Sequence, residues 1–312
     1  LKKVHPIPAY ILQYRELFKL KSTYIDALPE CINPHTGRIH TTFIQHRVAT
    51  GRLSSVDPNL QNIPTHGIGQ QVRAAFRLQR NDQVFISADY SQIELRVLAH
   101  FTQDPALVDA FKHNHDIHRE TAAGIFSIPS DQVTDEQRNV GKRINFSILY
   151  GLTPYGLSKD LDISLKDAKG FIEGYFAHYS KIQPWMHTVI ERAKIDGYVT
   201  TLFGRRRDVL GLRERNKNLY ELGCRIAVNT VIQGTSAEIM KMGMLGVQKY
   251  LKNNQFDAHM VLQIHDQLLI ECNENKSKIV KNEVKHILES VVQWNIPLVV
   301  ATGIGKSWKD AE

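Results

Sequence analysis

The chain has 312 residues, of which 42% are hydrophobic and 23% are charged, and its net charge is +7. This composition is typical of a folded protein with a sizeable core, and no apolar run reaches the length of a membrane span. The basic balance favours a polyanionic partner. The three scattered cysteines (Cys31, Cys224 and Cys272) indicate a reducing, cytoplasmic setting rather than a disulfide framework.

The first third of the chain predicts a helix, then strands. The helix follows the Pro6/Pro8 pair and extends to Leu28, with basic residues on its polar side. Residues 38–56 alternate apolar and polar side chains, which predicts strands and a turn. A short apolar strand follows at 83–89, then a helix from about 92 to 101. The sequence begins abruptly, without a start methionine, so we expect this chain to be a piece of a longer protein.

The remainder of the chain is mostly helical before a few final strands. Residues 104–196 predict successive helices separated by prolines, and Thr134 and Gln137 have the spacing of a capping box. The later segments predict, in order, a hairpin, a long helix, two strands around a tight turn, a helix and a strand: 197–212, 218–253, 258–271, 277–294 and 298–304. Strands at both ends around a helical middle indicate an α+β fold with one sheet interrupted by a helical insertion.

One predicted helix carries basic and aromatic residues at a regular interval. Arg138, Lys142, Phe146 and Tyr150 recur at an interval of four, which places them on neighbouring turns of one face. That face runs from cations to aromatic rings over roughly 18 Å. This length suits a nucleoside triphosphate, with phosphates on the cations and the base against the rings. The alternative is an amphipathic helix with solvated basic residues and an aromatic core stripe.

Two acids stand at the ends of apolar strands. Asp89 ends the strand at 83–89, and Asp266 lies at the bend between two later strands. A buried acid is costly unless positive charge offsets it. Magnesium prefers a few carboxylates together with substrate phosphates, so a pair of such acids predicts a divalent-metal site. For either acid alone, the alternative is a turn residue or a helix N-cap.

These motifs carry a resemblance to a known family. The chain resembles the polymerase core of the family A DNA polymerases, the DNA polymerase I type. The resemblance rests on several stretches in the expected order: Asp89–Arg96 (motif A), Arg138–Gly151 (motif B), Gln263–Asp266 (motif C), 49–55, 57–64 and 229–235.

The resemblance implies a right-hand polymerase fold of the α+β class, with an antiparallel palm sheet and a helical fingers insertion. Residues 1–30 would be a thumb remnant, 31–96 the first palm segment, 97–218 the fingers and 219–312 the second palm segment. Most of a thumb and any nuclease segment would then lie outside the match.

The resemblance also implies a role for each site residue. Asp89 and Asp266, with the backbone carbonyl of Tyr90, would hold two Mg²⁺ ions, and Lys142 would help protonate the pyrophosphate. The incoming nucleotide would be bound by Arg138, Lys142, His118, Phe146, Tyr150, Gln92 and Glu94, the last blocking a 2′-hydroxyl together with Tyr150. The DNA would be contacted by Arg15, Lys19, Arg52, Asn59, Gln61, Asn62, Arg225, Asn229, Gln233 and His265.

The implied function is that of a DNA-directed DNA polymerase core. It would add deoxynucleotides to a primer 3′ end by two-metal phosphoryl transfer, as a monomer that binds primer–template DNA and dNTPs and no membrane. Two alternatives are a single-subunit RNA polymerase-like enzyme, against which Glu94 and Tyr150 argue, and a catalytically weakened DNA-binding relative.

Motif C departs from the family pattern, because Gln267 stands where a glutamate usually follows Asp266. The substitution removes one negative charge near the predicted metals but not a bridging ligand. We therefore expect Gln267→Glu to change the extension rate by less than about tenfold, roughly 1.4 kcal/mol, in a primer-extension assay. A thousandfold gain would instead show that the amide disables the site.

Overall fold

The chain folds into two compact units. The computed structural model describes residues 5–151 and 153–312. The first unit, here called the sheet unit, comprises the chain up to Asp89 together with Met244–Ile287 and Val300–Glu312. The second, the helical unit, comprises Tyr90–Gly243 and Leu288–Val299. None of the described helices is both long and apolar enough to cross a membrane.

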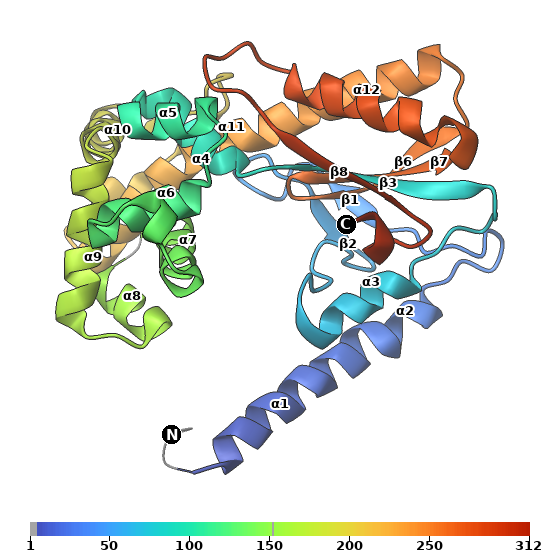
Figure 1. The fold of residues 1–312 in the computed structure, drawn as a ribbon, viewed down its shortest axis with the longest axis horizontal. Coiled ribbons are helices and arrows are strands. Elements are labelled where there is room, and N and C mark those ends of the chain that lie inside the picture. The colour runs from blue at the N-terminus through green and yellow to red at the C-terminus, as the bar shows by residue number, and fades with distance from the viewer. Residues whose placement is uncertain (1–4, 152) are drawn as a thin grey trace. The chain divides into compact units, whose positions relative to one another are not determined.

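A four-stranded sheet forms the centre of the sheet unit (Figure 1). Its strands, in the order β6-β7-β3-β8, are Ala258–Ile264, Gln267–Asn273, Gln83–Tyr90 and Val300–Gly305. The strand pairs β3–β7 and β6–β7 are antiparallel. Nearly every residue of β3 is buried, which agrees with its mostly apolar sequence. The sheet thus joins an early strand to strands near the end of the chain, as an interrupted sheet requires.

The strands and turn predicted at 38–56 and the hairpin predicted at 197–212 are confirmed, but in the described chain they form two separate two-stranded sheets rather than parts of one sheet. One pairs β1 (Thr42–Ile44) with β2 (Ser54–Val56), and the other pairs β4 (Tyr198–Thr200) with β5 (Arg206–Asp208). Both are hairpins whose strands have three residues.

The first helix of the sheet unit is interrupted where one continuous helix was predicted. The α-helix α1 covers Ile7–Leu20, continues as a π-helical turn over Lys21–Ile25, and ends in α2, Ala27–Glu30. The π turn places Tyr24 so that its hydroxyl donates to the carbonyl of Asn62 at 2.6 Å. This contact is a tertiary reason for a wide turn that local sequence does not announce.

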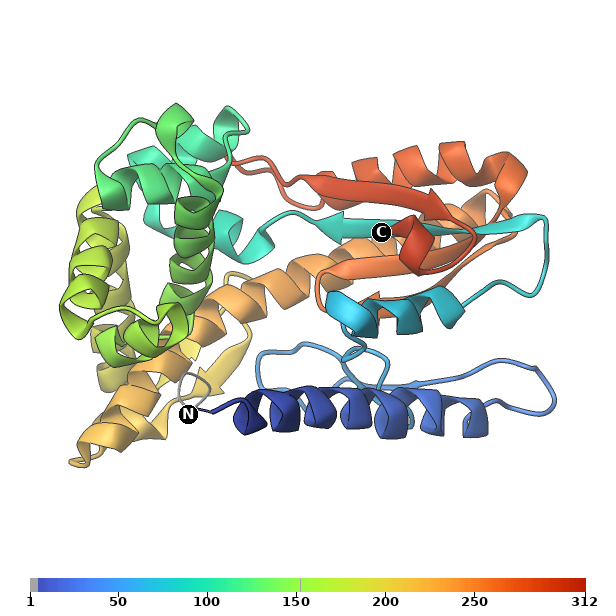
Figure 2. The same ribbon diagram turned by 60° about the horizontal axis from the view of Figure 1, so that its bottom comes forward.

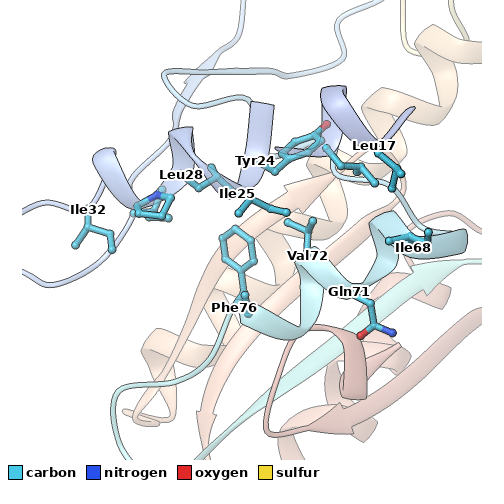
Figure 3. A pocket seen from close by; sticks show the side chains of 13 residues that line it. Leu17, Tyr24, Ile25, Leu28, Ile32, Ile68, Gln71, Val72 and Phe76 are labelled. Carbon is cyan, nitrogen blue, oxygen red and sulfur yellow. The ribbon is translucent and has the colours of Figure 1, made fainter. Parts of the chain in front are cut away.

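An apolar pocket of about 480 Å³ separates this N-terminal helical segment from α3, Gln71–Ala75 (Figure 3). Leu17, Tyr24 and Leu28 face Val72 and Phe76 across it. Below the pocket, a core cluster unites these helices with the sheet through Leu20, Tyr24, Leu28, Leu60, Ile63, Phe85, Leu262, Ile264, Leu269 and Trp308. The cluster anchors α3 beside the end of the sheet, while α12 (Ser277–Glu289) lies on the sheet's other side (Figures 1 and 2).

Helices make up most of the helical unit. In chain order they are α4 (Ile93–Thr102), α5 (Pro105–Lys112), α6 (Ile117–Phe126), α7 (Asp135–Leu149), α8 (Pro154–Leu161), α9 (Leu165–His178) and α10 (Ile182–Asp196), followed by α11 (Lys217–Asn253), which continues into the sheet unit. Side-chain caps fix several starts, and the capping box of Thr134 and Gln137 is confirmed at the start of α7.

Helix α12 ends at Glu289, five residues before the predicted end at Trp294. Two β-branched residues, Val291 and Val292, lower helix propensity just past this point. Trp294 lies outside the helix and stacks on His100 at a ring-centroid distance of 4.0 Å. A tertiary stacking contact therefore replaces the extra helical turn that the sequence predicted.

Gly141 lets α6 and α7 approach closely. A Cβ atom at this position would overlap the backbone carbonyl of His118 and crowd Ala122. We expect Gly141→Ala to lower the free energy of unfolding by about 1–3 kcal/mol, because overpacking forces the helices apart. Urea unfolding measures this loss. Gly170→Ala in α9 is the matched control: a Cβ there meets nothing within 4 Å, so that variant should be neutral or slightly more stable.

Candidate active site

The two predicted metal-binding acids lie together in the sheet unit. Asp89, near the end of β3, is paired in register with Gln267 at the start of β7. Asp266 is in the tight turn just before Gln267, where His265 adopts a left-handed conformation with φ of 54°. Because adjacent antiparallel strands carry the two acids, both line one cavity of about 540 Å³. The chain thus brings the two carboxylates to one end of the sheet.

The charge on these carboxylates is poorly compensated by the protein. Burial, together with the nearby charges of Asp266 and Glu312, raises the pKa of Asp89 to about 7, although Arg73 acts in the opposite direction. Burial also raises the pKa of Asp266. Within the described chain, the buried Oδ1 of Asp89 has no hydrogen-bond partner. A cation shared by the two acids would remove this repulsion.

These residues fit a divalent metal of the magnesium type. Both donors are carboxylates, the hard oxygen ligands that Mg²⁺ prefers. Among the residues that the structure describes, no group of three or more His, Cys, Asp or Glu side chains forms a closed metal cage. An open site with two acids leaves coordination positions for water and for phosphate oxygens, which is the usual arrangement for Mg²⁺ in phosphoryl-transfer sites.

Arg73 borders the same cavity, and sequence reasoning missed it. It is 1% exposed and donates to the carbonyl of Ile63 at 2.8 Å. Its guanidinium lies over the Trp308 ring, 4.3 Å from the centroid, and forms an ion pair with Glu312. Nothing in the spacing around residue 73 distinguishes a buried arginine from a solvated one, because its partners are far away in sequence.

Gln267, the departure in motif C, is fully engaged. Its Nε2 donates to Ser87 Oγ at 2.8 Å and to Glu312 Oε1 at 3.1 Å. The amide therefore lines the cavity and uses its donor group, which a glutamate carboxylate could not do. Glu312 was also missed from the sequence, since no motif marks it.

In the helical unit, α7 exposes the predicted nucleotide-binding face. Phe146 is 38% exposed and Tyr150 is 45% exposed, whereas Ile144 and Ile148 are buried. The alternative of an aromatic core stripe was therefore wrong. Aromatic rings that are partly exposed on a helix can present a face to a planar ligand.

Arg138 is held by an acid that the sequence did not single out. Its Nε lies 2.6 Å from Oδ2 of Asp116. Asp116 caps α6 by accepting from the backbone amides of His118 and Arg119. Burial would raise the pKa of the Asp116 carboxyl, but the hydrogen bonds from Arg138 and from these amides lower it overall. The carboxylate thus stays charged and fixes the arginine.

His118 is buried against the same face. It is 3% exposed, its ring lies 5.7 Å from the Phe146 ring, and its Nδ1 is 3.1 Å from Nδ2 of Asn145. Because an amide nitrogen donates, Nδ1 accepts and the ring proton lies on Nε2. Burial lowers the pKa of His118 to about 4, with Arg138 and Lys142 adding to that effect and Asp116 opposing it. His118 is therefore a neutral donor at pH 7.

The burial of His118 predicts that the free energy of unfolding depends on pH. The folded-state pKa of His118, about 4, lies below the unfolded value of 6.5, so the unfolded chain binds more protons between these pH values. Its contribution to the free energy of unfolding is intact above pH 6.5 and falls by about 2 kcal/mol at pH 5. Urea unfolding at pH 7 and pH 5 should show a smaller drop for His118→Gln. His187→Gln, at an exposed position of α10, should leave the drop unchanged.

Tyr150 meets Glu94 at the end of α7. The Tyr150 hydroxyl is 3.4 Å from Oε2 of Glu94, which is 8% exposed in α4. Gln92 precedes α4 in a left-handed conformation with φ of 49°. After Tyr150, Gly151 has φ of 73°, and a Cβ there would overlap the side chain of Arg225 in α11. The predicted residues Glu94, Tyr150 and Arg225 therefore border one region of the helical unit.

The remaining predicted contacts are distributed over both units. Arg225, Asn229 and Gln233 follow one face of α11 at intervals of four, and the buried Oδ1 of Asn229 lacks a hydrogen-bond partner among the described residues. Tyr90 ends β3, and its hydroxyl donates to the carbonyl of Leu288 at 2.7 Å. The predicted DNA contacts in the sheet unit are Arg15 and Lys19 on α1, Arg52, Asn59, Gln61 and Asn62 in loops, and His265 in the turn.

The Gln61 side chain forms hydrogen bonds within the sheet unit. Its Nε2 donates to the backbone carbonyl of Gln263 at 3.1 Å and to its side-chain oxygen at 3.0 Å. Asn59 accepts from the Gln61 amide at 3.0 Å, as in an Asx turn. These two side chains therefore hold a loop against β6, and any DNA contact by Gln61 would have to break or share those bonds.

The family is shown by comparison with known proteins. A model described as DNA polymerase family A matches residues 1–310, and the chain belongs to this family. It is 45% identical to the thermostable DNA polymerase I of Thermus aquaticus over all of this chain and 37% of that protein. It is also 45% identical to DNA polymerase I of Deinococcus radiodurans, covering 100% of this chain and 32% of that one. The chain thus spans about a third of the length of these relatives.

A solved structure supports the same assignment. The POL domain of Pol1 from M. smegmatis, in complex with DNA primer-template and dNTP, matches 99% of this chain with a TM-score of 0.95 and 38% identity. The match covers 55% of that chain. The predicted family and the α+β polymerase fold are therefore confirmed.

Proposed function

We propose that this chain is a DNA-directed DNA polymerase core. It adds deoxynucleotides to the 3′ end of a primer on a DNA template and releases pyrophosphate. The observation that carries the proposal is the pair of partly buried acids, Asp89 and Asp266, in one cavity of a family A chain. The complex of the related POL domain with primer-template and dNTP supports the same partners.

Two Mg²⁺ ions would be held by Asp89 and Asp266 with the backbone carbonyl of Tyr90. When bound, such ions favour ionisation of an attacking hydroxyl and neutralise charge on a triphosphate. The unpartnered oxygen of Asp89 and the repulsion between the two carboxylates support this assignment. Because Asp89 is fixed by strand pairing and Asp266 by the tight turn between the paired strands β6 and β7, the chain contributes preorganised negative charge.

The triphosphate would bind the cationic end of α7. The Asp116 bond to Nε orients Arg138 and leaves its two Nη groups without another hydrogen bond in the part of the chain that is described, so they can meet phosphate oxygens. Lys142 would bind a phosphate and give its proton to the departing pyrophosphate. His118 would donate one neutral hydrogen bond from Nε2. Phosphoryl transfer needs mainly positioning and charge stabilisation, which these groups supply.

The aromatic end of α7 would bind the base and sugar. Phe146 and Tyr150 are exposed for stacking, and Gln92 would lie with them in the nucleotide site. Glu94, near the Tyr150 hydroxyl, would exclude a ribose 2′-hydroxyl and so select deoxynucleotides. This assignment favours a DNA polymerase over an RNA polymerase.

Primer–template would contact both units. Arg52 and Gln233 would donate hydrogen bonds to acceptor atoms of the bases in the minor groove. These acceptors are partly common to A·T and G·C pairs, so the contacts would not depend strongly on sequence. The proposed organisation has a thumb remnant at 1–30, palm segments at 31–96 and 219–312, and fingers at 97–218. We expect a cytoplasmic monomer, a setting that agrees with the three free cysteines.

Primer extension tests the proposal. A labelled DNA primer on a DNA template is incubated with Mg²⁺ and deoxynucleotides, and in parallel with ribonucleotides. Template-directed growth with deoxynucleotides that is lost in Asp266→Ala is the expected result. Preferential ribonucleotide incorporation would favour the RNA polymerase alternative. Primer–template binding without growth in either protein would favour a catalytically idle relative.

A further inference from the structure

Glu312 places a third carboxylate at the cavity of the two acids. Its side chain lines the same cavity as Asp89 and Asp266 and is 19% exposed. Its charge is among the causes that raise the pKa of Asp89. The cavity therefore holds a third carboxylate beside the two predicted metal-binding acids.

Three donors fix this carboxylate. Oε1 of Glu312 accepts from Nε1 of Trp308 at 3.0 Å and from Nε2 of Gln267 at 3.1 Å. It also forms the ion pair with Nη1 of Arg73. A glutamate whose oxygen is held by an indole, an amide and a guanidinium has little rotational freedom.

Gln267 and Glu312 form a complementary pair. The amide of Gln267 donates to the carboxylate of Glu312, and a carboxylate at position 267 would lack that donor and repel Glu312. Gln267 lies directly after Asp266 and opposite Asp89 in the strand register. The negative charge absent at position 267 is thus present on Glu312, across one hydrogen bond.

Glu312 also forms an ion pair with the buried Arg73. Arg73 is buried and its charge acts on Asp89, lowering the pKa of that acid. Pairing with Glu312 neutralises the guanidinium at short range. Without the pair, Arg73 would be an unmatched buried cation beside the acids and would oppose the binding of another cation.

We propose that Glu312 is a positioning residue of the divalent-metal site, where its carboxylate holds Gln267 in place and neutralises the buried Arg73 beside the two acids. The inference rests on the proposed function, because it assigns divalent metal to Asp89 and Asp266. It adds a residue outside the three sequence motifs to that site.

Binding of Mn²⁺ alone tests this inference without relying on catalysis. Titration of the protein with Mn²⁺, followed by electron paramagnetic resonance, gives the affinity. Glu312→Gln keeps the size and one acceptor oxygen but removes the charge. We expect about tenfold weaker Mn²⁺ binding, about 1.4 kcal/mol. Asp310→Asn is the control: Asp310 lies in the same short turn, but its carboxylate accepts from Ser307 Oγ at 2.7 Å. Its affinity should stay within about twofold of wild type.

An exchange variant separates charge from folding. Gln267→Glu combined with Glu312→Gln reverses the amide–carboxylate pair and keeps the total charge. We expect this double variant to recover Mn²⁺ affinity to within about threefold of wild type, since either position can then present the carboxylate. The fluorescence of Trp308, which contacts Glu312, reports whether the local structure is retained.

The outcomes separate this inference from the proposed function. Asp266→Asn should abolish the high-affinity Mn²⁺ signal, and an unchanged signal in that variant would overturn the metal site and the inference together. Loss in Asp266→Asn with wild-type affinity in Glu312→Gln would overturn the inference alone. An equal loss in Asp310→Asn, or no recovery in the folded exchange variant, would also overturn it.

Discussion

Asp266→Asn is expected to slow single-nucleotide addition by at least about 10⁴-fold, which corresponds to about 5.4 kcal/mol of transition-state stabilisation. Asparagine has nearly the same shape, so the turn between β6 and β7 should keep its conformation. It lacks the charge, however, and Asp89 would remain as the only predicted carboxylate ligand. Rapid-quench kinetics at saturating nucleotide and Mg²⁺ measure the chemical step.

The same variant should gain stability while it loses activity. The pKa of Asp266 is raised in the folded state, so its ionisation disfavours the native state as the pH rises above the unfolded value of 3.8. Removing the charge also relieves Asp89 of a repelling neighbour. Without metal at pH 7.5, Asp266→Asn should therefore unfold at a higher urea concentration than wild type.

Asp257→Asn provides the control for this prediction. Asp257 pairs with Arg80 at the surface of the sheet unit, with Nη1 and Oδ2 2.9 Å apart. Its loss should change neither rate nor stability by much, because exposed ion pairs contribute little. A rate for Asp266→Asn within tenfold of wild type, with primer–template binding intact, would contradict the assignment of Asp266 to the metal site.

Local rules were enough to predict the parts that carry these acids. The continuous apolar run before Asp89 indicated a buried strand, and the apolar runs on both sides of Asp266 indicated a hairpin. The capping box at Thr134 set the start of α7 correctly. Each of these signals lies within a few residues of the element that it predicts, so no tertiary information was needed.

The surroundings of the acids depended on contacts that local rules do not contain. Arg73 looks like any basic residue of a short helix, and only folding places Glu312, Trp308 and the Ile63 carbonyl around it. The exposure of Phe146 was likewise undecided, because the interval of four fits a core stripe and a ligand face equally well. Burial of a polar group, or exposure of an apolar one, is decided by tertiary packing.

Lys142→Met is expected to slow nucleotide addition by about 10³-fold, about 4 kcal/mol. Methionine keeps an unbranched side chain of good helix propensity, so α7 should remain intact. What it removes is a cation on the exposed face between Arg138 and Phe146. In the described chain Lys142 makes no ion pair, so its charge is available to a phosphate. Single-turnover kinetics with a correct nucleotide measure the loss.

Arg143→Met decides whether that loss comes from a particular cation or from the basic character of α7. Arg143 is the next residue, but its guanidinium pairs with Asp160, with Nη1 and Oδ2 3.4 Å apart. Both variants lower the net charge by one, so a long-range electrostatic effect would slow both to a similar degree and vanish at high salt. A phosphate contact and proton transfer would slow Lys142→Met alone, at every salt concentration. Equal losses would therefore remove Lys142 from the catalytic residues and leave α7 with a general attraction for the triphosphate.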